Sequence, residues 1–152
     1  DLHRTAMEAD MAHNLGDVQD RFGDMLSPQL RELIARGRKV AAVDYLRAVS
    51  WLWPLNGAME AIFDDVNAVI TPATPGPAPG PDTTGNPVFC SPWTYLGVPA
   101  VTLPLLQSAD GMPIGVQIVA RRGDDAKLLR TARWIADAVG GRKSRRGKGQ
   151  AK

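Results

Sequence analysis

The chain has 152 residues, about one domain, and its 44% hydrophobic and 22% charged residues are ordinary for a globular protein. Its single cysteine, Cys90, excludes an internal disulfide and suits a reducing compartment, so we predict a cytoplasmic location. No apolar run approaches the roughly 20 residues that a membrane-spanning helix needs, and we predict no membrane partner.

The formal net charge of +2 hides an asymmetry along the chain. Six of the 18 basic residues fall within the last eleven positions, which contain no acid, so the rest of the chain holds 12 basic and 16 acidic residues. We predict a domain over residues 1–140 and a basic, disordered tail over residues 141–152. The tail could contact phosphates, but it has no interleaved aromatic residues, so a nucleic-acid partner is not expected.

The N-terminal part is predicted to be helical. Met7, Met11 and Leu15 recur at helical spacing and indicate a first, weakly amphipathic helix. The stretch SPQLRELIARG predicts a second helix, with Ser27 as its cap, Pro28 in the first turn and Gly37 at its end.

A third helical stretch begins near Asp44, which is a plausible cap. Pro54 lacks a backbone N–H and clashes with the preceding turn, so we expect the helix to break near it. Trp51 and Trp53 are interpreted as packing residues, because aromatic side chains bury large areas in cores.

Three strands and a final helix are predicted in the second half. The apolar stretch VNAVITP predicts a buried strand that ends at Pro72, and VPAVTLPL and MPIGVQIVA predict an antiparallel hairpin around Asp110-Gly111. The stretch DDAKLLRTARWIADAVGG predicts a helix that starts at Asp124 or Asp125 and ends at Gly140 and Gly141.

Residue chemistry alone gives no complete active site. His3, His13 and Cys90 lack the spacing of a zinc site, and no phosphate-binding glycine loop occurs, so we predict no metal and no cofactor. None of the five serines lies in a glycine-rich turn, and neither histidine is placed as a base for Cys90, so no catalytic residue is assigned.

Several ordered motifs nevertheless occur in sequence: DDVNAVITPATPGPAP, TGNPVFCSPWTYLGVPAVTLPL, GMPIGVQIVA and DDAKLLRTARWIADA. In this order they resemble the C-terminal part of the amidase-signature family, and the resemblance covers about residues 1–140. It implies an α/β fold in which helices flank a mixed β-sheet. It also implies that the proline-rich stretch from Thr71 is an ordered, rigid loop rather than a linker.

The resemblance implies hydrolysis of a carboxamide C–N bond by a Ser, cis-Ser, Lys triad with an oxyanion hole. The family carries its nucleophile on a Gly-Gly-Ser-Ser-Gly-Gly stretch upstream of this region, and this sequence contains no such stretch. We therefore expect the C-terminal portion of an amidase. When joined to an N-terminal part, it would supply strands of the sheet and walls of a channel that binds a small-molecule amide. On its own it would be inactive.

Four residues are candidates for the substrate-channel wall: Phe89, Cys90, Trp93 and Tyr95. Their aromatic rings and thiol would offer an apolar surface with few polar points, which is typical of small-molecule sites. The alternative is that Phe89 and Trp93 pack beneath the loop.

Two other functions remain open. The chain could be a non-catalytic α/β module whose role is association, for which an exposed sheet edge would allow self-association. It could also be a fragment of the A-type component of a glutamine-dependent tRNA amidotransferase, which the basic tail favours only weakly.

Overall fold

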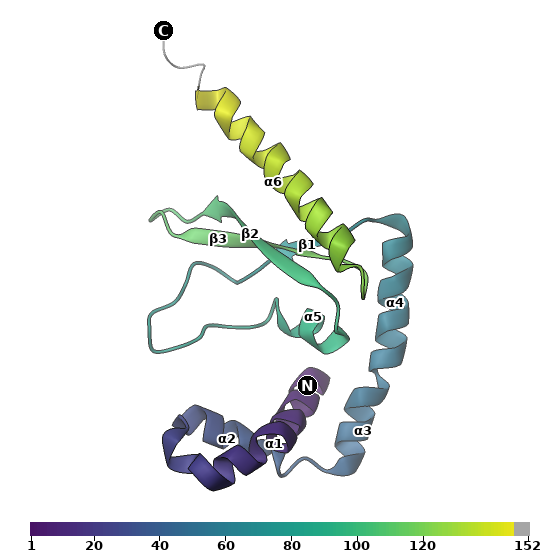
Figure 1. The fold of residues 1–152 in the computed structure, drawn as a ribbon, viewed down its shortest axis with the longest axis vertical. Coiled ribbons are helices and arrows are strands. Elements are labelled where there is room, and N and C mark those ends of the chain that lie inside the picture. Colours follow the sequence, from purple (N-terminus) through teal and green to yellow (C-terminus); the bar gives the residue numbers. More distant parts are fainter. Residues whose placement is uncertain (148–152) are drawn as a thin grey trace. The chain divides into compact units, whose positions relative to one another are not determined.

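The computed structural model describes the backbone of residues 1–147 and the side chains up to Gly140 (Figure 1). Within it the chain forms two compact units, Asp1–Asn56 and a second unit that starts at Gly57, and each is described by itself. The boundary lies inside the helix α4 (Leu52–Asp65). The predicted division at residue 140 stays a prediction.

The first unit is a small helical assembly of α1 (Leu2–Phe22), the 3-10 turn η1 (Gly23–Met25), α2 (Pro28–Gly37) and α3 (Ala42–Ser50). Both α2 and α3 pack on α1. Ile34 of α2 is fully buried. The ion pair between Arg36 Nε and Glu8 Oε1, at 2.8 Å, joins α2 to α1.

The predicted start and the predicted end of α2 are both confirmed. The Ser27 hydroxyl accepts a hydrogen bond from the Leu30 amide at 3.3 Å, and Pro28 is the first helical residue. Gly37 is the last residue of the helix, and its φ is not positive. A side chain there would overlap the Glu8 carbonyl group, so the glycine is needed for the close approach of α2 to α1.

The break near Pro54 is confirmed, since α3 ends at Ser50 and α4 begins at Leu52, which places Pro54 in the first turn of α4. Two related predictions are wrong. Ala41 occupies the N-cap of α3, while Asp44 lies in its first turn and pairs with Arg47. Trp51 and Trp53 are not packed in a core, since they are 48% and 88% exposed.

The second unit contains a three-stranded antiparallel sheet in the order β1-β3-β2, formed by β1 (Val69–Pro72), β2 (Ala100–Gln107) and β3 (Pro113–Val119). The predicted hairpin of β2 and β3 is confirmed, and Gly111 takes a positive φ of 87° in its turn. The α/β class is also confirmed.

The strand β1 was expected to be buried, and this is wrong. Because β3 is central, β1 pairs on one side only, and its residues are alternately half-buried and exposed. Pro72 does end the strand as predicted. On the other edge, Pro104 lies where β2 shifts register between Leu103 and Leu106.

The helix α6 (Asp125–Gly147) lies along one face of the sheet, and the short helix α5 (Ser91–Leu96) lies on the other side (Figure 1). The core beneath α6 contains Ile118 of β3 and Ala120 just after it, together with Leu128 and Ala132 of the helix. These side chains are at most 5% exposed. Packing of α6 on alternating residues of the central strand therefore defines the main core of this unit.

The helix α6 begins at Asp125, as predicted, but it does not end at Gly140 and Gly141. It continues to Gly147, and neither glycine has a positive φ. A glycine inside a helix costs only about 1 kcal/mol relative to alanine, so the flanking helix-forming residues can carry the helix through. The rest of the predicted tail, Lys148–Lys152, lies outside the described residues.

Candidate functional site

The candidate site is organised by Gln117, a buried polar residue in the central strand β3. Its side-chain Nε2 donates to the Phe89 carbonyl at 2.9 Å and to the Thr71 hydroxyl at 3.3 Å. Thr71 is the residue of β1 directly opposite Gln117 in the ladder. One amide group thus ties the sheet to the segment that follows the proline-rich loop.

Cys90 reinforces the same junction. Its Sγ lies 3.6 Å from the Ala73 carbonyl oxygen and 4.0 Å from Gln117 Oε1, distances that suit weak thiol hydrogen bonds. The residue as a whole remains exposed. Phe89 and Cys90, both predicted from sequence, are therefore brought together on the β1–β3 face that Gln117 marks.

Trp93 and Tyr95 lie on α5, a helix that was not predicted from the sequence. Cys90 occupies its N-cap, Pro92 its first turn, and Gly97 ends it with a left-handed φ of 66°. This is the same combination of serine-proline start and glycine end that predicted α2, so the signal was present in the sequence. Both aromatic residues are half-buried.

The environments of these two side chains differ. Trp93 Nε1 is buried and has no hydrogen-bond partner in the described part of the chain. Burial raises the pKa of Tyr95 above its usual value of 10.0. None of the four predicted wall residues lines any of the three cavities described for this structure. The role of Phe89, Cys90, Trp93 and Tyr95 as a substrate-channel wall therefore stays a prediction.

A second polar junction holds the end of α4 against the sheet. Arg121, just after β3, pairs with Glu60 at 2.8 Å and with Asp64 at 2.6 Å, and these carboxylates raise its pKa. Asp64, near the end of α4, therefore binds an arginine beyond the end of β3. All three side chains are partnered, which indicates a structural role rather than acid–base chemistry.

The described residues show no group of three or more His, Cys, Asp or Glu side chains that could hold a metal ion. His3 and His13 both lie on α1. Over the same part of the chain, none of the helices combines the length and apolar character that crossing a bilayer requires.

The first unit contains a cavity of about 450 Å³ next to Tyr45, lined also by Asp10 and His13. The Tyr45 hydroxyl donates to Asp10 Oδ1 at 3.0 Å, and this bond raises the pKa of Tyr45. The protonated phenol is the form that the fold stabilises. This hydrogen bond therefore stabilises the folded unit at pH values below the ordinary tyrosine pKa of about 10. The stabilisation is lost as the pH rises through the raised pKa of Tyr45.

We expect both tyrosines of the chain to ionise above their ordinary pKa, for different reasons. An absorbance titration at alkaline pH measures this directly. Asp10→Asn should lower the pKa of Tyr45, because the charged acceptor is lost, and should leave Tyr95 unchanged. Asp17→Asn, an exposed change on the same helix, is the control. Identical titration curves for the Asp10 variant and the parent chain would contradict the assignment.

The fold corresponds to part of an amidase-signature structure. The chain superposes on a solved structure described as an amidase with a TM-score of 0.78 and 27% identity, covering 88% of this chain. The family model described as Amidase matches residues 6–129, and the chain belongs to this family. The resemblance stated from the motifs is thereby confirmed.

Two curated relatives illustrate the range of the family. The chain is 30% identical over 142 residues to a fatty acid amide hydrolase of Medicago truncatula, covering 85% of this chain. It is 31% identical over 128 residues to the A-type component of the glutamyl-tRNA(Gln) amidotransferase of Xanthobacter autotrophicus, covering 74% of this chain.

In every case this chain spans only a part of the relative. It covers 23% of the plant hydrolase, 26% of the amidotransferase component and 34% of the solved amidase. Family membership therefore describes the region present here, and the activity of a whole amidase is a separate question.

Proposed function

We propose that this chain is the C-terminal portion of an amidase-type hydrolase that cleaves carboxamide C–N bonds, and that it is inactive on its own. The observation that carries the proposal is the match to the amidase family over residues 6–129, together with the absence from the sequence of the Gly-Gly-Ser-Ser-Gly-Gly stretch. The chain would supply strands and a wall of the substrate channel to a catalytic part.

The Gln117 junction supports this division of roles. Gln117 fixes the backbone of Phe89 against the sheet, so the apolar segment that begins there is held on rigid elements. Preorganised walls orient a substrate without forming bonds to it. Phe89, Cys90, Trp93 and Tyr95 would contact the apolar part of an amide substrate, while the nucleophile would come from the other part.

The first test is an assay of the isolated chain against aryl, aliphatic and fatty acyl amides. We expect no hydrolysis above the uncatalysed rate, because the chain carries no activated nucleophile. Hydrolysis that is abolished by changing one of the five serines to alanine would overturn the proposal.

The second test is a chimera in which residues 1–140 replace the matching third of the solved amidase. We expect the chimera to hydrolyse amides. Tyr95→Phe and Phe89→Ala should change KM or the preference among acyl groups, because these side chains would contact substrate. Val18→Ala, at an exposed position of α1, is the matched control and should leave both parameters unchanged.

The likeness to an amidotransferase component favours a second candidate, in which the chain belongs to a tRNA-linked amidase. Basic residues after Gly141 would then contact RNA phosphates. This candidate predicts salt-dependent tRNA binding that is lost when residues 141–152 are deleted. Binding that survives the deletion, or no binding at low salt, would exclude the tail as an RNA contact.

A further inference from the structure

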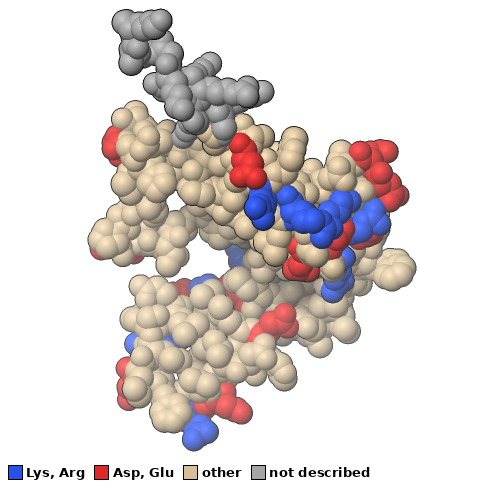
Figure 2. Space-filling view, turned by 45° about the horizontal axis from the view of Figure 1, so that its top comes forward, with Lys and Arg blue, Asp and Glu red and all other residues tan. Residues whose placement is uncertain are grey.

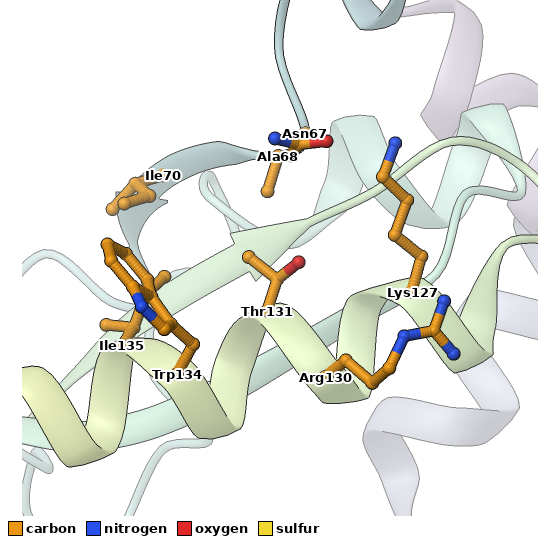
Figure 3. A pocket seen from close by; sticks show the side chains of 8 residues that line it. All are labelled: Asn67, Ala68, Ile70, Lys127, Arg130, Thr131, Trp134 and Ile135. Atoms are coloured by element: carbon orange, nitrogen blue, oxygen red, sulfur yellow. The ribbon is translucent and has the colours of Figure 1, made fainter.

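A groove of about 660 Å³ lies between the segment around β1 and the helix α6 (Figure 3). Asn67 and Ile70 line one wall, and Lys127, Arg130 and Trp134 line the other. All of these residues belong to the second unit. Small-molecule sites typically have volumes of about 300–1,000 Å³, so the groove has room for a small molecule.

The two ends of the groove differ in chemistry. Ile70, Trp134 and Ile135 gather at one end, while the cationic groups of Lys127 and Arg130 lie at the other (Figure 3). Ile70 is 58% and Trp134 71% exposed, so the apolar end is open to an occupant. Lys127 and Trp134 are seven positions apart on α6, which separates the two ends by about 10 Å.

The charged end lacks a partner of opposite sign. No Asp or Glu lines the groove, and no ion pair in the described part of the chain involves Lys127 or Arg130. Arg121 provides a contrast, because Glu60 and Asp64 pair with it at 2.8 Å and 2.6 Å. Figure 2 shows Lys and Arg side chains gathered in a band on one face of the molecule. An anionic head group would therefore complement this end of the groove.

The chain itself is a poor source of that anion. Its last eleven residues carry six basic and no acidic side chains, so they are repelled by the charged end. A second copy docked by two-fold symmetry would bring two identical cationic ends into one interface, with no acidic side chain of the groove between them. The occupant that fits is therefore a separate small molecule with an anionic head and an apolar body.

We propose that this groove binds a medium-chain carboxylic acid, with its carboxylate at Lys127 and Arg130 and its alkyl chain against Ile70 and Trp134. An eight-carbon acid matches the distance of about 10 Å between the two ends. The choice of a carboxylate over other anions rests on the proposed function, because water cleaves a carboxamide into a carboxylic acid and an amine or ammonia. The guanidinium of Arg130 can donate two parallel hydrogen bonds to such a head group.

The first test is a calorimetric titration of the full chain with octanoate, octanamide and octylamine, which share an alkyl chain and differ in charge. We expect saturable binding of octanoate with a Kd of about 1 mM or tighter. The neutral amide and the cationic amine should bind at least tenfold more weakly. Absent or unsaturable binding of octanoate, or equal binding of all three, would overturn the proposal.

The charged end is tested by removing its cations. Lys127→Gln combined with Arg130→Gln should weaken octanoate binding at least tenfold and leave octanamide binding unchanged. Arg133→Gln removes a charge from an exposed residue of α6 that does not line the groove, and it should leave both unchanged. A loss per charge as large for Arg133→Gln as for the double variant would mean general electrostatics and contradict the assignment.

The apolar end is tested through chain length. Trp134→Ala should weaken octanoate binding several-fold, whereas Leu129→Ala should not, because Leu129 is 60% exposed on the same helix but does not line the groove. Butanoate is too short to reach from the cations to Trp134. It should bind more weakly than octanoate and be insensitive to Trp134→Ala. Equal sensitivity of the two acids to this change would contradict the proposed orientation.

Two further measurements identify the occupant. Octyl phosphate that binds at least tenfold more tightly than octanoate would make a phosphorylated amphiphile the occupant and overturn the proposal. Sedimentation that reveals a dimer of this chain, dissociated by Trp134→Ala, would make a second copy the occupant and overturn it equally.

None of these readouts measures amide hydrolysis. Octanoate binding is decided on the isolated chain, where the proposed function predicts no turnover. Failure of this inference and failure of the proposed function are therefore distinguishable.

Discussion

Gly37→Ala is expected to destabilise the first helical unit by about 3 kcal/mol or more, because the added methyl group would overlap backbone atoms of α1. The new carbon would lie 2.6 Å from the Glu8 carbonyl carbon and 2.8 Å from Ala12 Cβ. Backbone atoms cannot rotate away, so α1 and α2 would have to separate. That movement would also stretch the ion pair between Arg36 and Glu8.

The lost free energy of unfolding is measured by thermal and urea unfolding of the parent chain and of the Gly37→Ala variant. Gly57→Ala is the matched control, because the added carbon would meet no atom within 4 Å outside its own stretch of helix and the position is inside α4. That change should stabilise the chain by about 1 kcal/mol through helix propensity. If both variants shift stability in the same direction, the close packing at Gly37 does not explain its presence.

The second large effect is expected at Gln117. Gln117→Met keeps the length of the side chain but removes its donor group, leaving the Phe89 carbonyl and the Thr71 hydroxyl without this partner. The cost should be about 2 kcal/mol, the range for unsatisfied buried polar groups. Gln117→Glu should cost more at neutral pH, because it buries a charge, and should recover as acid neutralises that carboxylate.

Cys90 provides an independent readout of the same junction, because it is the only cysteine of the chain. Its thiol contacts the Ala73 carbonyl beside Gln117, so release of the Phe89–Cys90 backbone should raise its rate of reaction with a disulfide reagent several-fold. Gln29→Met, an exposed change on α2, should not alter the rate. An unchanged rate in the Gln117 variants would show that the amide does not hold this segment.

The features that could be predicted from the sequence are those with local causes. Ser27 and Pro28 start α2 through neighbouring backbone groups, and Asp110-Gly111 turns the hairpin within a few residues. The motifs that indicated the amidase family also lie in continuous stretches. Each of these signals requires only residues that are close in the chain.

The features that were missed depend on contacts between distant residues. Gln117 meets Phe89 from 28 positions away, and no periodicity reports that pairing. The exposure of Ile70 follows from the strand order, which places β3 rather than β1 in the centre. Gly37 does end α2 as predicted, but its close contact with Glu8 of α1 could not be read from the sequence.

The prolines at the two edges of the sheet have a consequence for aggregation. Pro72 has no N–H to offer at the open edge of β1, and Pro104 lies in a bulge that interrupts the edge of β2. A cross-β fibril requires long, regular edges that can template one chain after another. Both edges are short or interrupted, so the sheet offers little for open-ended polymerisation.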